Sequence, residues 1–444
     1  MLSKVFKSSW QKDVAKATKR ITNVAFKYPK GFQASGTIVG VKPNNSTKLD
    51  LAFIASQKPC SAAAVVTKTK FQAAPITFNR RLLESNSSNI RGVIINSGNA
   101  NAVTGPGGLS DAAAMSETAS KYLGADASAL VMSTGVIGQR LPIKRILDGV
   151  PAAHEALGDS DMHWLECATA ICTTDTFPKL KSKSFTLPSS PSVEYQMVGM
   201  TKGAGMICPN MATLLGVIAT DAPIAAPALQ TALRAATDKS FNSISIDNDM
   251  STNDIVAVLA NGAAGGAEVT AENKADFEAF QAVLNDLSVD LAKLIVEDGE
   301  GATKFITIRV TDALSEAGAR QIAATVAQSS LFKTAMYGKD ANWGRIVAAA
   351  GSAFVRPGQA QVDDAPDLDT EAMNVSLVPA DGSAKLELLV NGTPKVVDES
   401  RAAEILQMDK VEVLISLGTG SHEAIHWTCD LSHEYVTING DYRT

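Results

Sequence analysis

One threonine near the middle of the chain, Thr213, stands where a peptide bond could be converted into a reactive amino terminus. It lies in the segment KGAGMICPNMATLLG, which runs from Lys202 to Gly216. A threonine hydroxyl is a poor nucleophile unless a base takes its proton, and the residue's own free α-amino group can be that base. The ordinary pKa of such an amine, about 7.7–8.0, suits this task near neutral pH.

An internal threonine gains a free amino group if the chain cuts itself directly before it. The Thr213 hydroxyl would attack the carbonyl of Ala212, the peptide would become an ester, and water would release the new amine. Such a bond must be held exposed and strained. Pro209–Asn210 and the preceding glycines provide turn chemistry that can present it. The same pattern also fits a threonine that only begins a strand, so spacing alone does not decide between the two.

The pattern HEAIH, from His422 to His426, matches the H-E-x-x-H signature of zinc proteases. That motif needs a helix, which places both histidines on one face and the glutamate beside a metal-bound water. Here the pattern follows the turn residues SLGTG. The segment after it, WTCDLSHEYVTI, is predicted to be a strand. His433 or Glu434 could supply a third ligand, but we expect a solvated turn rather than a zinc site.

Two other patterns lack residues that their ligands require. DNDMSTND, Asp247 to Asp254, resembles the start of a calcium loop, but the sixth and twelfth positions are Thr252 and Val258 instead of Gly and Glu. We expect a strand end followed by a helix N-cap there. Glycine-rich turns such as Gly203–Gly205 complete neither G-x-G-x-x-G nor a P-loop, so they predict no nucleotide-binding loop.

The composition favours a large globular protein of a reducing compartment. The chain has 444 residues, of which 45% are hydrophobic and 19% charged, so a sizeable core is expected and global disorder is not. A net charge of −6 and 5% aromatic residues argue against a nucleic-acid surface. The five cysteines are odd in number and form no C-x-x-C pair, which argues against a disulfide scaffold.

The first thirty residues differ from the rest of the chain. They carry eight Lys or Arg and a single acid, Asp13. Leu2, Val5, Phe6 and Trp10 fall on helical spacing. This basic, amphipathic and acid-poor pattern is typical of a mitochondrial presequence, so we expect residues 1–30 to be a targeting segment and the mature protein to lie in the mitochondrial matrix. A basic surface helix is the alternative.

The elements that must position Thr213 alternate between strand and helix patterns. GVIINSGNANAVTG and ALVMSTGVIG each predict a strand that ends in a turn, and LLGVIATDA predicts a buried strand directly after Thr213. The uncharged stretch 203–220 therefore indicates a loop and a strand, not a membrane span. Residues 275–298 give the longest helical pattern, and NVSLVPADGSAKLELLV predicts a hairpin. We expect a layered α/β protein with mixed sheets.

Six segments of the chain resemble, in the same order, those of the ornithine acetyltransferase family. They are KGAGMICPNMATLLGVIATD, VMSTGVIG, CTTDTFPK, DGEGATKF, YGKDANWGRI and DLSHEYVTINGDY. The resemblance covers nearly all of the chain after the first thirty residues, and the basic N-terminus makes it similar to the fungal mitochondrial form. It implies the ornithine acetyltransferase/DmpA-like self-processing fold, with mixed sheets layered with helices. It also implies self-cleavage between Ala212 and Thr213.

The resemblance further implies a reaction. An acetyl group would pass from N-acetylornithine to Thr213 and then to glutamate, giving ornithine and N-acetylglutamate in arginine biosynthesis. This is ping-pong acyl transfer through a threonine ester. No metal and no organic cofactor are implied; acetyl-CoA is a further possible donor, which nothing in the sequence decides.

Thr134 and Gly135, in VMSTGVIG, match the oxyanion-hole pair of the family. The position between a strand and a turn provides an exposed hydroxyl and a backbone N–H that no side chain crowds. An ordinary turn at a strand end is the alternative for these two residues.

Other positions match the family's substrate-binding residues. Lys202, the only charge at the head of the central segment, could pair with a substrate carboxylate, and Glu300, between two glycines, could pair with an amine. The alternatives are a solvated strand end for Lys202 and a helix-end acid for Glu300. The matching residues are Thr173, Lys202, Thr213, Glu300, Asn439 and Thr444.

Self-cleavage would divide the chain into an alpha chain, residues 31–212, and a beta chain, residues 213–444. The resemblance implies that both remain together as a heterotetramer of two alpha and two beta chains, with small molecules as substrates and no nucleic-acid or membrane partner. Two other classes stay open. A related self-cleaving aminopeptidase or amidase would share the nucleophile but use water as acceptor, and an uncleaved binding or structural protein would need no nucleophile.

Overall fold

Eight strands form the larger of two sheets in the computed structural model, which describes residues 26–42, 47–208, 214–354 and 368–440. The strand order is β4-β3-β2-β9-β7-β6-β5, and β1 pairs with β2. The β3–β4 and β7–β9 pairs are parallel and the others antiparallel, so the sheet is mixed as expected. Its strands are β1 (Phe32–Thr37), β2 (Leu51–Val66), β3 (Ile90–Asn96), β4 (Ser128–Ser133), β5 (Lys179–Leu187), β6 (Ser190–Lys202), β7 (Leu215–Thr220) and β9 (Ile255–Ala260).

The long strand β2 joins the two halves of this sheet. Its first half pairs with β3 and its second half with β9, with a register shift between Ala55 and Cys60. Phe53 faces one core cluster and Ile54 another, as the alternation of a strand requires. Strands β7 and β9 are buried on both faces, which explains why they are continuously apolar in sequence.

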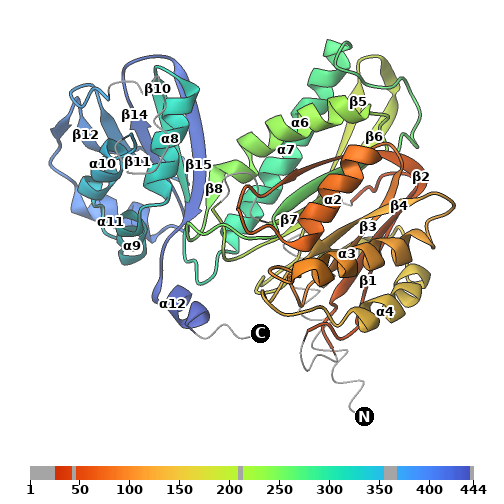
Figure 1. The fold of residues 1–444 in the computed structure, drawn as a ribbon. Helices are drawn as coiled ribbons and strands as arrows, with labels where there is room; N and C mark the ends of the chain where they lie inside the picture. The colour runs from red at the N-terminus through yellow and green to blue at the C-terminus, as the bar shows by residue number, and fades with distance from the viewer. Residues whose placement is uncertain (1–25, 43–46, 209–213, 355–367, 441–444) are drawn as a thin grey trace.

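Helices cover the sheet where its strands are apolar. Two of them, α3 and α4, pack on the half that holds β3 and β4, and α6 and α7 pack on the half that holds β7 and β9. The opposite faces of both halves contribute to one shared core, together with α2 and α5 (Figure 1). These helices are α2 (Ala74–Ser85), α3 (Gly105–Ser120), α4 (Ile143–Glu155), α5 (Asp161–Ala170), α6 (Ala226–Lys239) and α7 (Lys274–Glu297), with the 3-10 turn η1 (Phe241–Ser243).

A second, seven-stranded sheet forms the other part of the molecule, in the order β13-β12-β11-β14-β10-β15-β8. Helices α8 to α11 bury their apolar faces against it in a separate core. The predicted hairpin is confirmed, because β11 and β12 pair antiparallel. The strands are β8 (Ile244–Ser245), β10 (Phe305–Ala313), β11 (Asn374–Pro379), β12 (Leu386–Val390), β13 (Thr393–Pro394), β14 (Lys410–Ser416) and β15 (His422–Cys429); the helices are α8 (Glu316–Ala327), α9 (Ser330–Gly338), α10 (Trp343–Gly351) and α11 (Glu399–Gln407).

The last helix, α12 (His433–Asn439), leaves the second part and lies below the junction of the two parts (Figure 1). The sequence predicts a strand for WTCDLSHEYVTI, and after Cys429 this prediction is wrong. The Ser432 side chain accepts a hydrogen bond from the N–H of Tyr435, which caps the helix N-terminus. The cap and the contact of Asn439 with Glu300 fix a helix where the residue types favour a strand.

Two further expectations are corrected. HEAIH is not a solvated turn but part of strand β15, in which His426 is buried and burial lowers its pKa to about 3. A strand cannot arrange H-E-x-x-H around a metal as a helix does. DNDMSTND precedes strand β9, not a helix, because its last residues lead into pairing with β2 and β7.

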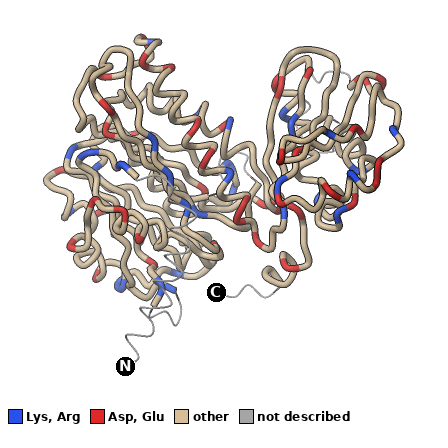
Figure 2. Tube along the Cα trace, turned by 180° about the vertical axis from the view of Figure 1, so that it is seen from behind, with Lys and Arg blue, Asp and Glu red and all other residues tan. Residues whose placement is uncertain are grey.

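Acidic and basic residues are interspersed over both parts of the described chain (Figure 2). No helix within the described ranges is long and apolar enough to cross a membrane. The stretch after residue 213 is the buried strand β7, as expected.

Candidate active site

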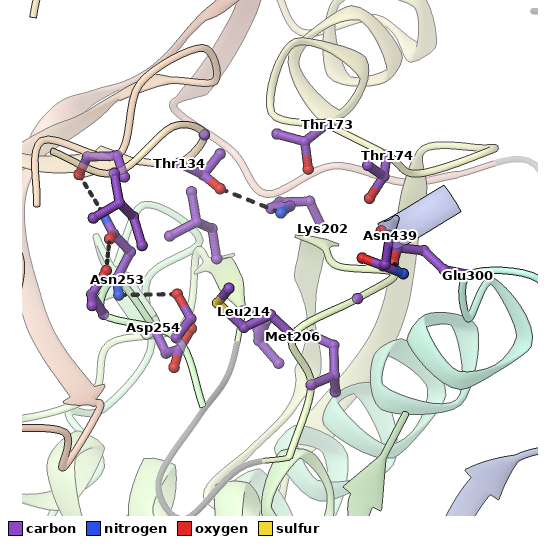
Figure 3. A pocket seen from close by; sticks show the side chains of 18 residues that line it. Thr134, Thr173, Thr174, Lys202, Met206, Leu214, Asn253, Asp254, Glu300 and Asn439 are labelled. Atoms are coloured by element: carbon purple, nitrogen blue, oxygen red, sulfur yellow. Dashed lines mark hydrogen bonds between the residues drawn. The ribbon is translucent and has the colours of Figure 1, made fainter. Parts of the chain in front are cut away.

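A cavity lies at one edge of the larger sheet, where several of its strands end and where the segment after α7 and helix α12 come close. The space inside it that protein atoms do not fill, including part of its mouth, is about 810 Å³. Its described walls bring together the expected site residues Thr134, Gly135, Thr173, Lys202, Glu300 and Asn439 (Figure 3). The charged residues among the described lining are Lys202, Asp254 and Glu300.

Thr134 and Gly135 follow the carboxyl end of β4. The Thr134 N–H continues the ladder by donating to the Asn96 carbonyl over 3.0 Å. Gly135 then turns with φ of +128°, and a Cβ there would lie 2.5 Å from the backbone carbon of Gly98. Only glycine fits this turn, which leaves the backbone beside the cavity free of any side chain.

Asn253 holds this turn from the neighbouring part of the sheet. Its side-chain amide donates to the carbonyls of Ala100, over 2.5 Å, and Ser133, over 2.8 Å. Asn253 is almost fully buried, so these bonds are shielded from water. Because Ser133 directly precedes Thr134, the amide of Asn253 fixes the backbone that presents the Thr134 hydroxyl.

Lys202 ends strand β6 and points toward Thr134 (Figure 3). Its ammonium donates a hydrogen bond of 3.3 Å to the Thr134 hydroxyl oxygen. A hydroxyl that accepts from a cation keeps its own proton available for another acceptor. The arrangement therefore places a positive charge and a free O–H donor side by side on the cavity wall.

Glu300 lies just after α7 and is paired with the last helix. The Asn439 amide donates to its carboxylate over 2.7 Å. The Glu300 N–H donates to the Ala204 carbonyl over 2.8 Å. A Cβ at Gly205 would lie 2.3 Å from the Glu300 carboxylate, so glycine in the segment KGAGM makes room for this acid. Only 8% of Glu300 is exposed.

Asp254 is a second buried acid of the cavity, at the start of β9. Burial raises the pKa of its carboxyl well above the ordinary value, although Ser251 and the Lys202 ammonium oppose that shift. The next residue, Ile255, donates its N–H to the Leu214 carbonyl over 2.8 Å. Asp254 thus lies beside the first described residue after the predicted cleavage point.

A buried ion-pair triad joins three of the segments that line the cavity. Lys179 contacts Asp175 and Asp298, each over 2.6 Å, and all three side chains are at most 1% exposed. Burial alone would raise the pKa of Asp175, but Lys179 and Lys202 hold it well below its usual range. Asp175 also accepts from the N–H groups of Thr173 and Gly203. The triad therefore positions the segments that carry Thr173, Lys202 and Glu300.

Three predicted positions, Ala212, Thr213 and Thr444, lie outside the described residues. Leu214, which follows Thr213 directly, lines the cavity. The six described candidates come from five separate segments and all line this one cavity. Their individual roles in a reaction remain predictions.

Sequence reasoning missed several residues of this site. The sequence analysis considers Asn253 and Asp254 only within the segment that resembles a calcium loop. Polar residues directly before an apolar strand are nevertheless a signal for a functional site at the edge of a sheet. Asp175 and Asp298 lie inside the motifs CTTDTFPK and DGEGATKF but received no role. No cluster of three or more potential metal ligands occurs within the part of the chain that the structure describes.

Comparison of the sequence with known proteins assigns the chain to a family. The sequence matches the ArgJ family over residues 33–444. It is 66% identical over 420 residues to the mitochondrial arginine biosynthesis bifunctional protein ArgJ of Pyricularia oryzae, covering 94% of this chain and 90% of the relative. The protein of the same name from Chaetomium globosum is 61% identical over 444 residues, covering 100% of this chain and 94% of the relative.

A solved structure is also similar, the arginine biosynthesis bifunctional protein from Bacillus halodurans. It is 36% identical, with 50% of this chain and 95% of that chain covered and a TM-score of 0.44. With a family match over residues 33–444 and relatives above 60% identity, the chain belongs to the ArgJ family and, like its fungal relatives, is a mitochondrial bifunctional acetyltransferase of arginine biosynthesis.

Proposed function

We propose that the chain cuts itself between Ala212 and Thr213 and uses the released threonine to move acetyl groups from N-acetylornithine to glutamate. The observation that carries this proposal is that one cavity gathers Leu214 with the six described residues expected to handle the acetyl group and its carriers. The Thr213 hydroxyl attacks the acetyl carbonyl, ornithine leaves with a proton, and the glutamate amine then takes the acetyl group from the ester.

Both halves of this reaction pass through a tetrahedral intermediate with a negatively charged oxygen. The Thr134 hydroxyl and the Gly135 N–H are the donors that we assign to it. The bond from Lys202 to Thr134 supports this role, because the hydroxyl accepts from the ammonium through one of its lone pairs and its proton is left to donate. The nearby ammonium adds a favourable positive potential for the oxyanion.

The charges of the cavity fit amino-acid substrates. Lys202 is the cation that we assign to a substrate carboxylate, and Glu300 is the acid that we assign to the side-chain amine of ornithine. Asn439 and Thr173 supply polar contacts around them, and Thr444 is expected to complete the set from the C-terminus.

The proposal includes the organisation of the mature enzyme. Residues 1–30 would be removed as a presequence, and residues 31–212 and 213–444 would form the alpha and beta chains of a heterotetramer. β7, which would begin directly behind the new amino terminus, is hydrogen-bonded to strands on both sides, β6 and β9. Cleavage before Thr213 would therefore leave the beta chain anchored in the sheet.

The test is to incubate the purified protein with N-acetylornithine, with and without glutamate, and to measure ornithine and N-acetylglutamate. We expect ornithine release to depend on glutamate and to match N-acetylglutamate formation one for one. Equal release of ornithine without glutamate would mean that water is the acceptor, and it would reject the transferase assignment in favour of a hydrolase.

A further inference from the structure

Asp430 is a buried acid that joins the segment after Glu300 to the start of α12. Only 2% of it is exposed. One of its carboxylate oxygens accepts hydrogen bonds from the N–H groups of Thr303 and Lys304, each over 2.8 Å. The other oxygen accepts from the Thr303 hydroxyl over 2.5 Å. A carboxylate that accepts three hydrogen bonds away from water fixes the two chain segments that it joins.

Ser432 adds a second connection between the same two segments. Its hydroxyl donates to the Gly301 carbonyl over 2.6 Å and accepts from the Tyr435 N–H over 3.2 Å. Gly301 has a φ of +68°, and a Cβ there would lie 2.5 Å from the Tyr435 nitrogen. Glycine at this position therefore lets the first turn of α12 lie directly against the neighbouring backbone. We call the contacts of Asp430 and Ser432 with residues 301–304 the C-terminal latch.

The C-terminal latch restrains two residues of the active-site cavity relative to each other. Glu300 lies between Gly299 and Gly301, so its sequence neighbours restrict its backbone little. Asn439 lies in the last turn of α12, and its amide donates to the Glu300 carboxylate over 2.7 Å (Figure 3). None of the described side chains of α12 is buried, so packing holds this helix only weakly. Hydrogen bonds at its start therefore decide whether Asn439 stays on Glu300.

Two other side-chain contacts also reach α12, and both are longer. The Tyr435 hydroxyl donates to the Asp247 carboxylate over 3.2 Å. The His433 ring nitrogen Nδ1 lies 3.3 Å from the Tyr337 hydroxyl oxygen. Each joins one side chain to another, whereas Asp430 grips the backbone with shorter bonds. Asp430 is thus the residue whose loss should most loosen the latch.

We propose that Asp430 is a positioning residue for the donor amine: through the C-terminal latch it holds the Glu300 carboxylate, with Asn439, where the side-chain amine of N-acetylornithine binds. This inference rests on the proposed function, which assigns Glu300 to that amine. Asp430 is not among the described residues that line the cavity, so it acts through Glu300 and not on the substrate. A carboxylate held in place binds an ammonium more tightly than a mobile one, because less conformational freedom is lost on binding.

Kinetics with both substrates test this role. Asp430→Asn keeps the size of the side chain but removes its charge and turns one acceptor oxygen into a donor. We expect kcat/KM for N-acetylornithine to fall about tenfold and kcat/KM for glutamate to change by less than about twofold. The matched control is Asp276→Asn in the first turn of α7, where another buried carboxylate accepts from a backbone N–H, that of Ser189, over 2.9 Å. Both values should stay near those of the wild type in this control.

A double variant separates an effect through Glu300 from general damage. In a Glu300→Gln background, Asp430→Asn should change kcat/KM for N-acetylornithine by less than about twofold. A full additional tenfold loss in that background would overturn the proposal, and so would equal losses for both substrates with Asp430→Asn alone. Thr303→Val removes the hydroxyl donor with little change of shape, and it serves if Asp430→Asn folds poorly. It should give a smaller loss confined to N-acetylornithine; a loss shared by glutamate would overturn the proposal.

Hydrogen exchange tests the latch without any substrate. In Asp430→Asn we expect faster exchange of the backbone amides of residues 300–304 and 433–439, and in Asp276→Asn the exchange of these residues should match the wild type. Unchanged exchange in Asp430→Asn would overturn the proposal. Wild-type kinetics with N-acetylornithine in Glu300→Gln would refute the role of Glu300 in the proposed function. A loss in Glu300→Gln without any loss in Asp430→Asn would refute this inference alone.

Discussion

Lys202 and Thr134 are joined across the cavity wall by a hydrogen bond of 3.3 Å from the lysine ammonium to the threonine hydroxyl. They belong to strand β6 and to the turn after β4, which lie 68 residues apart in the chain. Their contact places a cation next to the hydroxyl that we assign to the oxyanion hole.

Thr134→Ala should lower kcat by about 10² to 10³, because one donor to the oxyanion is lost while the substrate contacts remain. Steady-state kinetics with N-acetylornithine and glutamate measure this effect. Thr134→Ser keeps the hydroxyl and should retain most of the activity. A Thr134→Ala variant whose KM alone changes would assign Thr134 to substrate binding instead.

Glu300→Gln should discriminate between the two substrates. The carboxylate would be lost as a partner of the side-chain amine of N-acetylornithine, so the KM for this donor should rise about tenfold or more. Glutamate carries a side-chain carboxylate instead of that amine, so its KM should not rise. The two KM values are determined separately by varying each substrate at a saturating concentration of the other. A parallel rise of both values would show that Glu300 acts through the structure of the site and not through the ornithine amine.

Lys179→Met should lower the free energy of unfolding by about 3–5 kcal/mol, because it leaves two buried carboxylates without their cation. Urea denaturation measures this change. Lys183→Met is the matched control on the same strand: its partner Asp290 and Lys183 itself are about one-third exposed, at 39% and 34%. The control should cost less than about 1 kcal/mol. Equal losses in both variants would contradict the triad's structural importance.

Asp254→Asn should raise the melting temperature at pH 7. Burial gives the folded state a higher pKa for this carboxyl than the unfolded chain has, so the folded state holds the proton more tightly. The stability that Asp254 contributes therefore falls as the pH rises above its unfolded pKa of about 3.9. The gain from asparagine should be present at pH 7 and should disappear near pH 4 and below. A variant that melts at or below the wild-type temperature at pH 7 would refute this prediction.

Thr134, Gly135 and Glu300 are expected at one site from the family resemblance, and all three line the cavity, while their roles stay predictions. The Thr134–Gly135 turn and the Glu300 segment each combine a strand or helix end with glycine, and this local pattern is visible in sequence. Asn253 could not be assigned in the same way, because its partners, the carbonyls of Ala100 and Ser133, are more than a hundred residues away. The Lys179 triad is hidden for the same reason, since Asp298 lies 119 residues from Lys179.

In the fold, too, the features set by local sequence could be predicted, and those set by tertiary contacts could not. The mixed α/β class, the long helix near residues 275–298 and the β11–β12 hairpin follow from periodicity and turn chemistry. HEAIH and the residues of α12 were assigned wrongly, because their conformations are decided by tertiary contacts. Strand β15 pairs with β10 and β8, and α12 is held by its Ser432 cap and by Asn439 on Glu300. Local propensity is a weak guide at such positions.

Intact mass under denaturing conditions tests the central claim most directly. We expect the purified wild-type protein to give two fragments that break between Ala212 and Thr213, and Thr213→Ala to give one unbroken chain without transfer activity. A wild-type protein that stays a single chain while it transfers acetyl groups, or a Thr213→Ala variant that still divides at this bond, would contradict the account.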